Sequence, residues 1–139
     1  MTGPSKPLRA TVLVVEDDHI QREMLGLLLE ESQCEVIECE SAEAAEMVLQ
    51  RCGENLALMM TDVGLAGPMN GVELAHIARR CHPALDVIVT SGRPLPQELP
   101  DGAQFWPKPW APLDIIRVAE RMVLAQAAPA IAKPELPSA

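Results

Sequence analysis

Residues 11–24 read TVLVVEDDHIQREM, an apolar run that is followed at once by three acids and then by a helical pattern. A short run of apolar and β-branched residues is typical of a strand that is buried on both faces. After the acids, apolar residues recur at helical spacing from Ile20 to Leu28, which predicts a helix to about Ser32. The stretch is therefore expected to form a strand and a helix with acidic residues at the turn between them.

The same alternation continues along the chain. Strands are predicted at residues 11–15, 34–39, 56–61, 87–91 and 104–106. Further helices are predicted from an N-cap at Ser41 to about Cys52, from a capping box of Asn70 and Glu73 to about Cys81, and from Pro112 onward with Leu113, Ile116, Ala119 and Val123 on one face. Because parallel strands are joined by long right-handed crossovers, this order predicts a parallel sheet covered on both faces.

Polar residues fall at the ends of these strands. Glu16 and Asp17 follow the first strand, and Asp62 follows the third. Ser91 ends the fourth strand, and Lys108 follows the fifth. In sheets of this kind ligands bind at the carboxyl ends of the strands, so we expect these side chains to meet at one edge.

The acids at this edge need a cation if they meet. Two like charges ~4 Å apart repel by about 4 kcal/mol at an effective dielectric constant near 20. A site made of oxygen ligands favours Mg²⁺, with Mn²⁺ as a substitute. Beside such an ion a carboxylate can accept a phosphoryl group, and a lysine and a hydroxyl can stabilise the transferred oxygens. Lys108 and either Ser91 or Thr90 are available for those roles.

Four segments carry a family resemblance in the order in which they occur. They are TVLVVEDDHIQREM (11–24), LALMMTDVGLAGPMNGVELA (56–75), VIVTSG (87–92) and FWPKPW (105–110). Together they resemble the signatures of response-regulator receiver domains, the CheY-like family, over about residues 10–126. The resemblance implies a flavodoxin-like (CheY-like) α/β fold, a doubly wound five-stranded parallel sheet in the order 2-1-3-4-5. It places a receiver domain at residues 10–127, between proline-punctuated segments, residues 1–9 and 128–139, that are expected to be disordered.

The resemblance also implies a role for each residue at the edge. Asp62 matches the family's phospho-acceptor. The Mg²⁺ would be held by Glu16, Asp17 and Asp62, with Asp17 binding directly and Glu16 acting through water. The backbone carbonyl of Gly64 would be a further ligand, and Lys108 matches the family's lysine.

Two assignments stay open. Ser91 matches the family's hydroxyl position, with Thr90 as the register alternative. Phe105, three residues before Lys108, is either a plain core ring or the aromatic switch that turns inward, while Ser91 moves towards the phosphate, on phosphorylation. The Lys108–Pro109 bond is expected to be cis, as in the family, because X–Pro bonds lose most of their preference for trans.

As a member of this family, the chain would be a bacterial, stand-alone receiver of a two-component system or phosphorelay. A histidine kinase or a histidine phosphotransfer protein would donate the phosphoryl group, and phosphorylated Asp62 would alter binding to an unknown downstream protein target. Apart from self-phosphorylation and autodephosphorylation, no enzymatic activity is expected. The net charge of −9 argues against nucleic-acid binding. Because there is no signal peptide and no apolar stretch near the ~20 residues of a membrane span, the chain is expected in the cytoplasm, away from membranes.

The segment between the fourth and fifth predicted strands departs from the family. Residues 92–104 read GRPLPQELPDGAQ. Each proline costs ~3 kcal/mol inside a helix, so the family's fourth helix is predicted to be shortened or missing. A partner is then expected to dock on this irregular segment and on Trp106 or Trp110.

Two other functions stay open. A receiver-like interaction module would keep the fold without phosphorylation, although the acids, the hydroxyl and the lysine are all present. A Mg²⁺-dependent phosphohydrolase would also use Asp62 as a nucleophile. Such enzymes of the haloacid-dehalogenase type carry a second Asp two residues after the nucleophile, where this chain has Gly64. Uptake of one phosphoryl group would argue against the module, and steady turnover of small phosphomonoesters would support the hydrolase.

Overall fold

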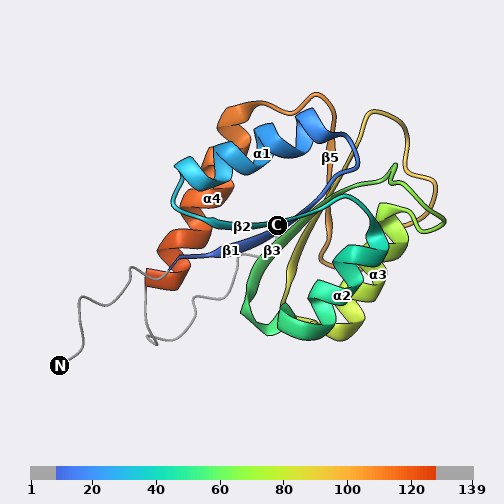
Figure 1. Ribbon diagram of the computed structural model, residues 1–139, viewed down its shortest axis with the longest axis horizontal. Coiled ribbons are helices and arrows are strands. Elements are labelled where there is room, and N and C mark those ends of the chain that lie inside the picture. The colour runs from blue at the N-terminus through green and yellow to red at the C-terminus, as the bar shows by residue number, and fades with distance from the viewer. Residues whose placement is uncertain (1–8, 128–139) are drawn as a thin grey trace.

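The computed structural model describes residues 9–127, and Figure 1 shows it as a ribbon. Its strands are β1 (Thr11–Val15), β2 (Glu35–Cys39), β3 (Leu56–Asp62), β4 (Asp86–Ser91) and β5 (Gln104–Pro107). Its helices are α1 (His19–Glu31), α2 (Ala42–Cys52), α3 (Gly71–Cys81) and α4 (Pro112–Ala127), with a short 3₁₀ turn, η1 (Gly53–Asn55), before β3. Each predicted strand and helix is present, so the alternating order is confirmed.

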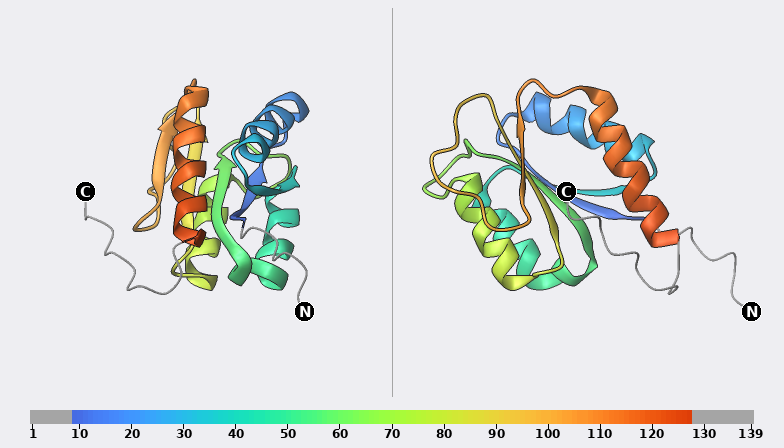
Figure 2. Two further views of the ribbon diagram at one scale, coloured as in Figure 1. Left: turned by 90° about the vertical axis from the view of Figure 1, so that its left-hand side faces the viewer. Right: turned by 180° about the vertical axis from the view of Figure 1, so that it is seen from behind.

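The strands pair in parallel in the order β2-β1-β3-β4-β5, which confirms the predicted topology. The pairing brings the carboxyl ends of the strands level. Val15 pairs with Cys39 on one side and with Thr61 on the other, and Asp62 pairs with Thr90. Helices α1 and α4 lie on one face of the sheet and α2 and α3 on the other (Figures 1 and 2). The loops that follow the strands therefore leave from one edge, at the upper right of Figure 1.

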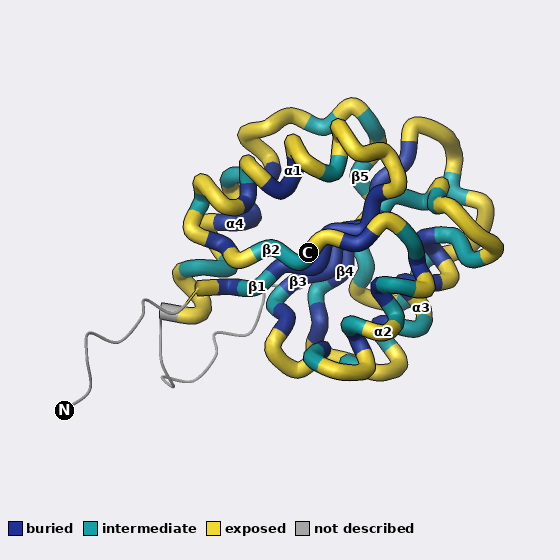
Figure 3. The backbone as a smooth tube through the Cα atoms, viewed as in Figure 1, coloured by how far each residue is buried: buried dark blue, intermediate teal, exposed yellow. Residues whose placement is uncertain are grey.

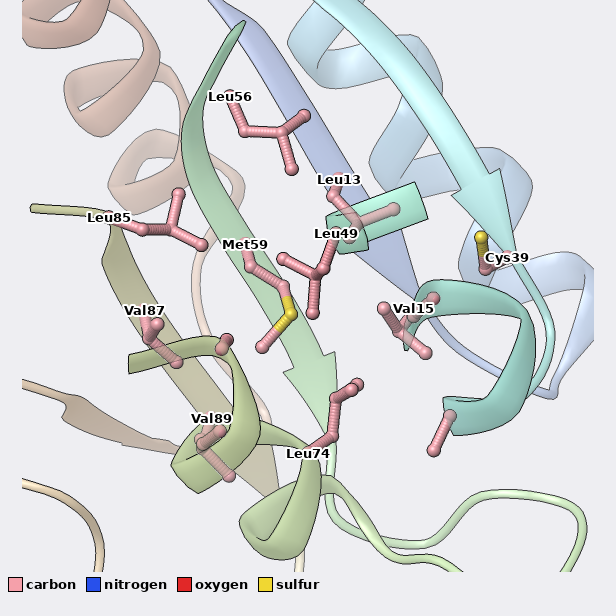
Figure 4. Packing of buried hydrophobic residues seen from close by; sticks show 14 of the residues in the cluster. Leu13, Val15, Cys39, Leu49, Leu56, Met59, Leu74, Leu85, Val87 and Val89 are labelled. Carbon is pink, nitrogen blue, oxygen red and sulfur yellow. The ribbon is translucent and has the colours of Figure 1, made fainter. Parts of the chain in front are cut away.

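Two apolar cores lie on the two faces of the sheet, because successive residues of a strand point to opposite sides. The core beneath α2 and α3 is built from buried side chains that include Leu13, Val15, Leu49, Met59 and Leu74 (Figure 4). The core beneath α1 and α4 includes Val12, Val14, Leu25, Leu58, Met60 and Ile115. The central strands are consequently buried along most of their length (Figure 3). Polar groups can then gather where the strands end.

Helices α2 and α3 begin at the caps that the sequence predicts, and α1 begins at a cap formed by Asp18. The side chains of Asp18 and Ser41 accept hydrogen bonds from the backbone amides three residues on, at 2.9 and 3.1 Å. Asn70 and Glu73 form the predicted capping box, in which each side chain accepts from the other's backbone amide, at 2.9 and 3.0 Å. Such caps satisfy N–H groups that have no partner inside the helix.

Strand boundaries differ from the predicted ones by one residue. β2 begins at Glu35, not at residue 34, because Cys34 N still donates to Leu29 O at 3.0 Å and closes the end of α1. β4 begins one residue earlier than predicted, and β3 and β5 end one residue later. Asp62 is therefore the last residue of β3 and is paired with Thr90 of β4.

The predicted apolar face of the last helix is correct at Ala119, which is buried, and at Val123, which packs against the core, but it is wrong at Leu113. In α4 the buried residues are Ile115, Val118 and Ala119, whereas Leu113 is 51% exposed. Together with the half-buried Met122, these buried residues follow the i, i+3, i+4, i+7 pattern of a core-facing stripe. A second apolar stripe through Leu113 overlaps it in the sequence, and contact with the sheet selects between the two.

No helix forms between β4 and β5, where residues 92–103 run as turns and bends, and this confirms the missing fourth helix. Leu95 and Leu99 are half-buried and pack against the core beneath α2 and α3. They supply part of the cover that a helix would give. His76 Nε2 on α3 lies 2.8 Å from Glu98 O and ties the segment down.

Apart from Arg9, the segments predicted to be disordered, residues 1–9 and 128–139, lie outside the described residues. Within residues 9–127, no helix is both long enough and apolar enough to cross a membrane.

Candidate functional site

The carboxylates of Glu16, Asp17 and Asp62 gather at the carboxyl edge of the sheet. One oxygen of each lies within 4.8 Å of the others. They meet because β1, which leads into the first two acids, is the neighbour of β3, which ends at the third. Glu16 is 6% exposed, whereas Asp17 faces solvent. Gly64 is close by, since a Cβ built on it would lie 3.9 Å from Asp62 Oδ2.

The ammonium group of Lys108 lies among these carboxylates. Its Nζ is 3.2 Å from Glu16 Oε1 and 3.3 Å from Asp62 Oδ1. The same Nζ donates to Gln21 Oε1 at 2.7 Å. The Lys108–Pro109 bond is cis, as predicted. The structure thus brings the predicted acids and the predicted lysine into one group.

Gln21 is a member of this group that the sequence does not reveal. Its spacing from Asp18 is that of a capping box, which predicts a bond from Asp18 N to the glutamine side chain. In the structure Asp18 N donates to Glu16 Oε2 at 3.1 Å instead. The Gln21 side chain is therefore available to Lys108.

Arg22 holds the acidic turn in place. Its Nη1 donates to Glu16 O at 2.8 Å, and its Nε lies 3.5 Å from Glu38 Oε1 on β2. Arg22 therefore joins the start of α1, the turn after β1 and the neighbouring strand. Fixing the Glu16 backbone limits how far its carboxylate can move from the group.

Burial raises the pKa of both Glu16 and Asp62. For Glu16, desolvation outweighs the bond from Asp18 N and the attraction of Lys108, and the charge of Asp62 adds to the rise. For Asp62, desolvation is again the largest cause, opposed by Lys108 and assisted by Asp17. One ammonium does not balance three carboxylates, so the group retains an excess of negative charge that suits a divalent cation.

These raised pKa values predict how the stability of the metal-free protein changes with pH. A carboxyl whose pKa is higher in the folded state binds protons more readily when folded, so the free energy of unfolding falls as pH rises through the window between the two values. The window begins near the ordinary values of 4.5 for Glu16 and 3.8 for Asp62 and extends upward. We expect the melting temperature to rise as pH is lowered from about 7 to about 5. Asp62→Asn should melt higher at neutral pH and show a smaller rise, and an identical pH dependence in this variant would contradict the assignment.

Both candidate hydroxyls are buried at the end of β4. Thr90 lines the same cavity as Asp62 and Lys108. Ser91 points to the other side of the strand, and its Oγ accepts a hydrogen bond from Arg93 N at 3.0 Å. The two residues therefore reach the edge from opposite faces of the sheet.

A cavity of about 240 Å³ opens beside Asp62, between α1 and the loop from β5 to α4. Its polar end is formed by Glu16, Gln21, Asp62, Thr90 and Lys108. Its apolar walls include Met24, Leu25, Pro109, Trp110 and Pro112. The cavity thus connects the Asp62 carboxylate with a partly apolar opening.

The aromatic residues near the site are exposed to different degrees. Phe105 is 37% exposed on β5, so its ring is not enclosed in the core. Trp106 and Trp110 are half-buried and pack against the core beneath α1 and α4. The side of β5 that the missing helix would cover therefore carries an exposed phenylalanine.

A parallel sheet in this order, with acids and a lysine converging on its carboxyl edge, defines a CheY-like α/β domain. The chain belongs to the response regulator receiver domain family, whose model matches residues 12–105. It is thus a receiver domain of the kind found in two-component signalling.

Two curated proteins show the sequence relationship. Over 117 residues the chain is 32% identical to the two-component response regulator ARR21 of Arabidopsis thaliana, a match that covers 82% of this chain and 19% of that protein. Over 81 residues it is 38% identical to a cyclic di-GMP phosphodiesterase of Thermotoga maritima, covering 58% of this chain and 21% of the other. The chain spans about a fifth of the length of these relatives.

Solved structures share the fold. A CheY-like receiver domain protein from Methanospirillum hungatei superposes with a TM-score of 0.75 at 23% identity, covering 86% of this chain and 98% of that one. A receiver protein from Sinorhizobium medicae gives a TM-score of 0.73 at 21% identity, covering 85% and 97%.

Proposed function

We propose that the chain is a phosphorylation switch in which Asp62 accepts a phosphoryl group from the phosphohistidine of a histidine kinase or a histidine phosphotransfer protein. The observation that carries this proposal is the contact of Lys108 Nζ with Asp62 Oδ1, at 3.3 Å, inside a group of carboxylates whose oxygens lie within 4.8 Å of one another. Converging carboxylates repel one another and destabilise the fold, so such a cluster indicates a functional site more than a structural role. Membership of the receiver family supports the same function.

The donor set of the site fits Mg²⁺. It consists of oxygens, it carries excess negative charge, and Asp17 leaves it open to solvent on one side. Glu16, Asp17, Asp62 and the carbonyl of Gly64 would hold the ion, with Mn²⁺ as a substitute. When bound, the ion would neutralise charge on the transferred phosphoryl oxygens.

The transfer itself needs the ionised carboxylate of Asp62. One of its oxygens forms a bond to phosphorus while the P–N bond of the phosphohistidine breaks, and the electron pair returns to the imidazole nitrogen. The charge of Lys108 favours the ionised form of Asp62 against the effect of burial. Water later attacks the phosphorus, breaks the bond to the Asp62 oxygen and restores the free carboxylate.

Lys108 and a hydroxyl stabilise the charge on the transferred group. The Lys108 ammonium, already in contact with Asp62, can donate to a phosphoryl oxygen. The Ser91 hydroxyl accepts from Arg93 N, which leaves its O–H able to donate, and Thr90 lines the cavity from the other face. Ser91 is proposed as the switch hydroxyl, with Thr90 as the register alternative. Slower uptake in Ser91→Ala than in Thr90→Ala would support this choice.

The downstream partner is proposed to bind residues 92–103 together with the exposed face of Phe105. The hydrogen bond between Ser91 Oγ and Arg93 N links the proposed switch hydroxyl to the start of this segment. Movement of the Ser91 side chain on phosphorylation would therefore alter this segment directly. The Phe105 ring would then turn inward. A bacterial cytoplasm is the proposed setting of the switch.

The chemical nature of the product tests the proposed function. With Mg²⁺ and phosphoramidate as a small donor, the protein should gain one phosphoryl group that hydroxylamine removes, because an acyl phosphate reacts with hydroxylamine and a phosphoserine does not. A chelator should prevent the gain. Steady turnover of small phosphomonoesters would favour the phosphohydrolase, and no gain at all would favour the non-phosphorylated interaction module.

A further inference from the structure

We propose that Gln21 is a positioning residue that holds the Lys108 ammonium in place for phosphoryl transfer, an inference that rests on the proposed function of Asp62. The bond from Lys108 Nζ to Gln21 Oε1 is 2.7 Å long. It is shorter than the contacts of the same nitrogen with Glu16 and Asp62, at 3.2 and 3.3 Å. The glutamine therefore makes the closest contact among the oxygens that surround the lysine.

The Gln21 side chain is free for this role because Glu16 accepts the hydrogen bond that the Asp18 amide would ordinarily donate to Gln21. Asp18 caps α1, and a glutamine three residues later would ordinarily bond to the Asp18 amide. That amide donates to Glu16 Oε2 at 3.1 Å. The Gln21 backbone amide still donates to Asp18 Oδ1 at 2.9 Å, so the residue is fixed on the first turn of α1 while its side chain reaches across to Lys108.

The neutrality of the glutamine is central to the inference. An ammonium has three N–H groups, and Lys108 has three oxygen neighbours: Gln21, Glu16 and Asp62. Two of these neighbours are carboxylates of the candidate metal site. Gln21 is the neighbour outside that group, so it can keep hold of the lysine when the carboxylates engage a cation. A glutamate here would add a further negative charge to the site.

A lysine side chain that loses such an anchor regains rotamer freedom and can move away from the phosphoryl position. A free lysine side chain has many rotamers, so fixing the ammonium in advance favours transfer. The Lys108 side chain is 23% exposed, which leaves it room to move towards solvent. The position of α1 beside the β5–α4 loop is what allows the anchor to form.

Kinetics of phosphoryl uptake test the inference. Gln21→Met keeps the length of the side chain and removes the acceptor, and it should slow uptake from phosphoramidate at saturating Mg²⁺ by about tenfold, the loss of one hydrogen bond to a charged group. In a Lys108→Ala background the same change should have no further effect, because Gln21 acts through the lysine. Glu30→Met, an exposed change on the same helix, is the matched control. An equal loss in both backgrounds, or no loss in either, would overturn the inference.

The reactivity of Lys108 gives a second readout that needs no phosphoryl transfer. The chain has two other lysines, Lys6 and Lys133, which serve as internal references when the protein is acetylated and mapped by mass spectrometry. Acetylation of Lys108 relative to Lys6 should rise severalfold in Gln21→Met and stay low in Gln21→Glu, which keeps the acceptor. An unchanged ratio in Gln21→Met would refute the anchor. If the wild type takes up no phosphoryl group, the proposed function fails and the positioning role fails with it, whereas normal uptake in Gln21→Met overturns the positioning role alone.

Discussion

Lys108→Ala is expected to slow phosphoryl uptake at Asp62 by a factor of about 10² to 10³, which is the usual loss for one donor that stabilises developing charge. The lysine contacts the acceptor oxygen directly, at 3.3 Å, and no other cationic side chain contacts Asp62 within residues 9–127. The measurement is the rate of mass gain with phosphoramidate at saturating Mg²⁺. Arg117→Ala, which removes an exposed positive charge from α4, is the control and should leave the rate unchanged.

The pH dependence of the same variant separates a catalytic loss from misfolding. Lys108 lowers the pKa of Glu16 and of Asp62, while burial raises both. Without the lysine both pKa values should rise further, so Asp62 should ionise at a higher pH in the variant than in the wild type. Uptake by Lys108→Ala should therefore recover in part as pH is raised. A rate equal to that of the wild type at every pH would contradict the role given to Lys108.

Gly71→Ala is expected to lower the free energy of unfolding by about 3 kcal/mol, because the added methyl group has no space. A Cβ at Gly71 would lie 1.9 Å from Asp62 O and 3.0 Å from Thr61 Oγ1. Gly71 N also donates to Val63 O at 2.9 Å, so the start of α3 packs directly on the backbone that carries Asp62. The measurement is urea unfolding of the wild type and the variant.

Gly92→Ala is the matched control for this prediction. The nearest atom to a Cβ at Gly92 is Lys108 Cβ, at 4.0 Å, which is an ordinary contact. The control should unfold near the wild-type midpoint, whereas Gly71→Ala should unfold at a clearly lower urea concentration and take up phosphoryl groups more slowly. Equal urea midpoints for the two variants would contradict this prediction, because the backbone at Asp62 would then have shifted to make space for the methyl group.

The sequence predicts the main features of the fold and of the site because these depend on short-range patterns. Five apolar runs predict the strands, and the rule that the ends of parallel strands meet at one edge places Asp62 with Glu16 and Asp17. Prolines predict the absence of a helix between β4 and β5, since each of them removes a backbone donor.

Other features depend on contacts between distant segments and could not be predicted. The bond between Gln21 and Lys108 joins two turns that only the packing of α1 beside the β5–α4 loop brings together. The helix α4 carries two overlapping apolar stripes, and packing against the sheet determines which of them is buried. The contact of Asn70 Nδ2 with Gln97 Oε1, at 3.1 Å, is likewise set by how the proline-rich segment lies across α3.

The most direct test of the account is the intact mass of the wild type and of Asp62→Asn after incubation with Mg²⁺ and phosphoramidate. Asparagine keeps the size of the side chain and removes the nucleophilic carboxylate, so any difference reports on the acceptor. We predict that the wild type gains the mass of a single phosphoryl group and that Asp62→Asn gains none. A wild type of unchanged mass, or an equal gain in both proteins, would contradict the assignment of Asp62 as the phosphoryl acceptor.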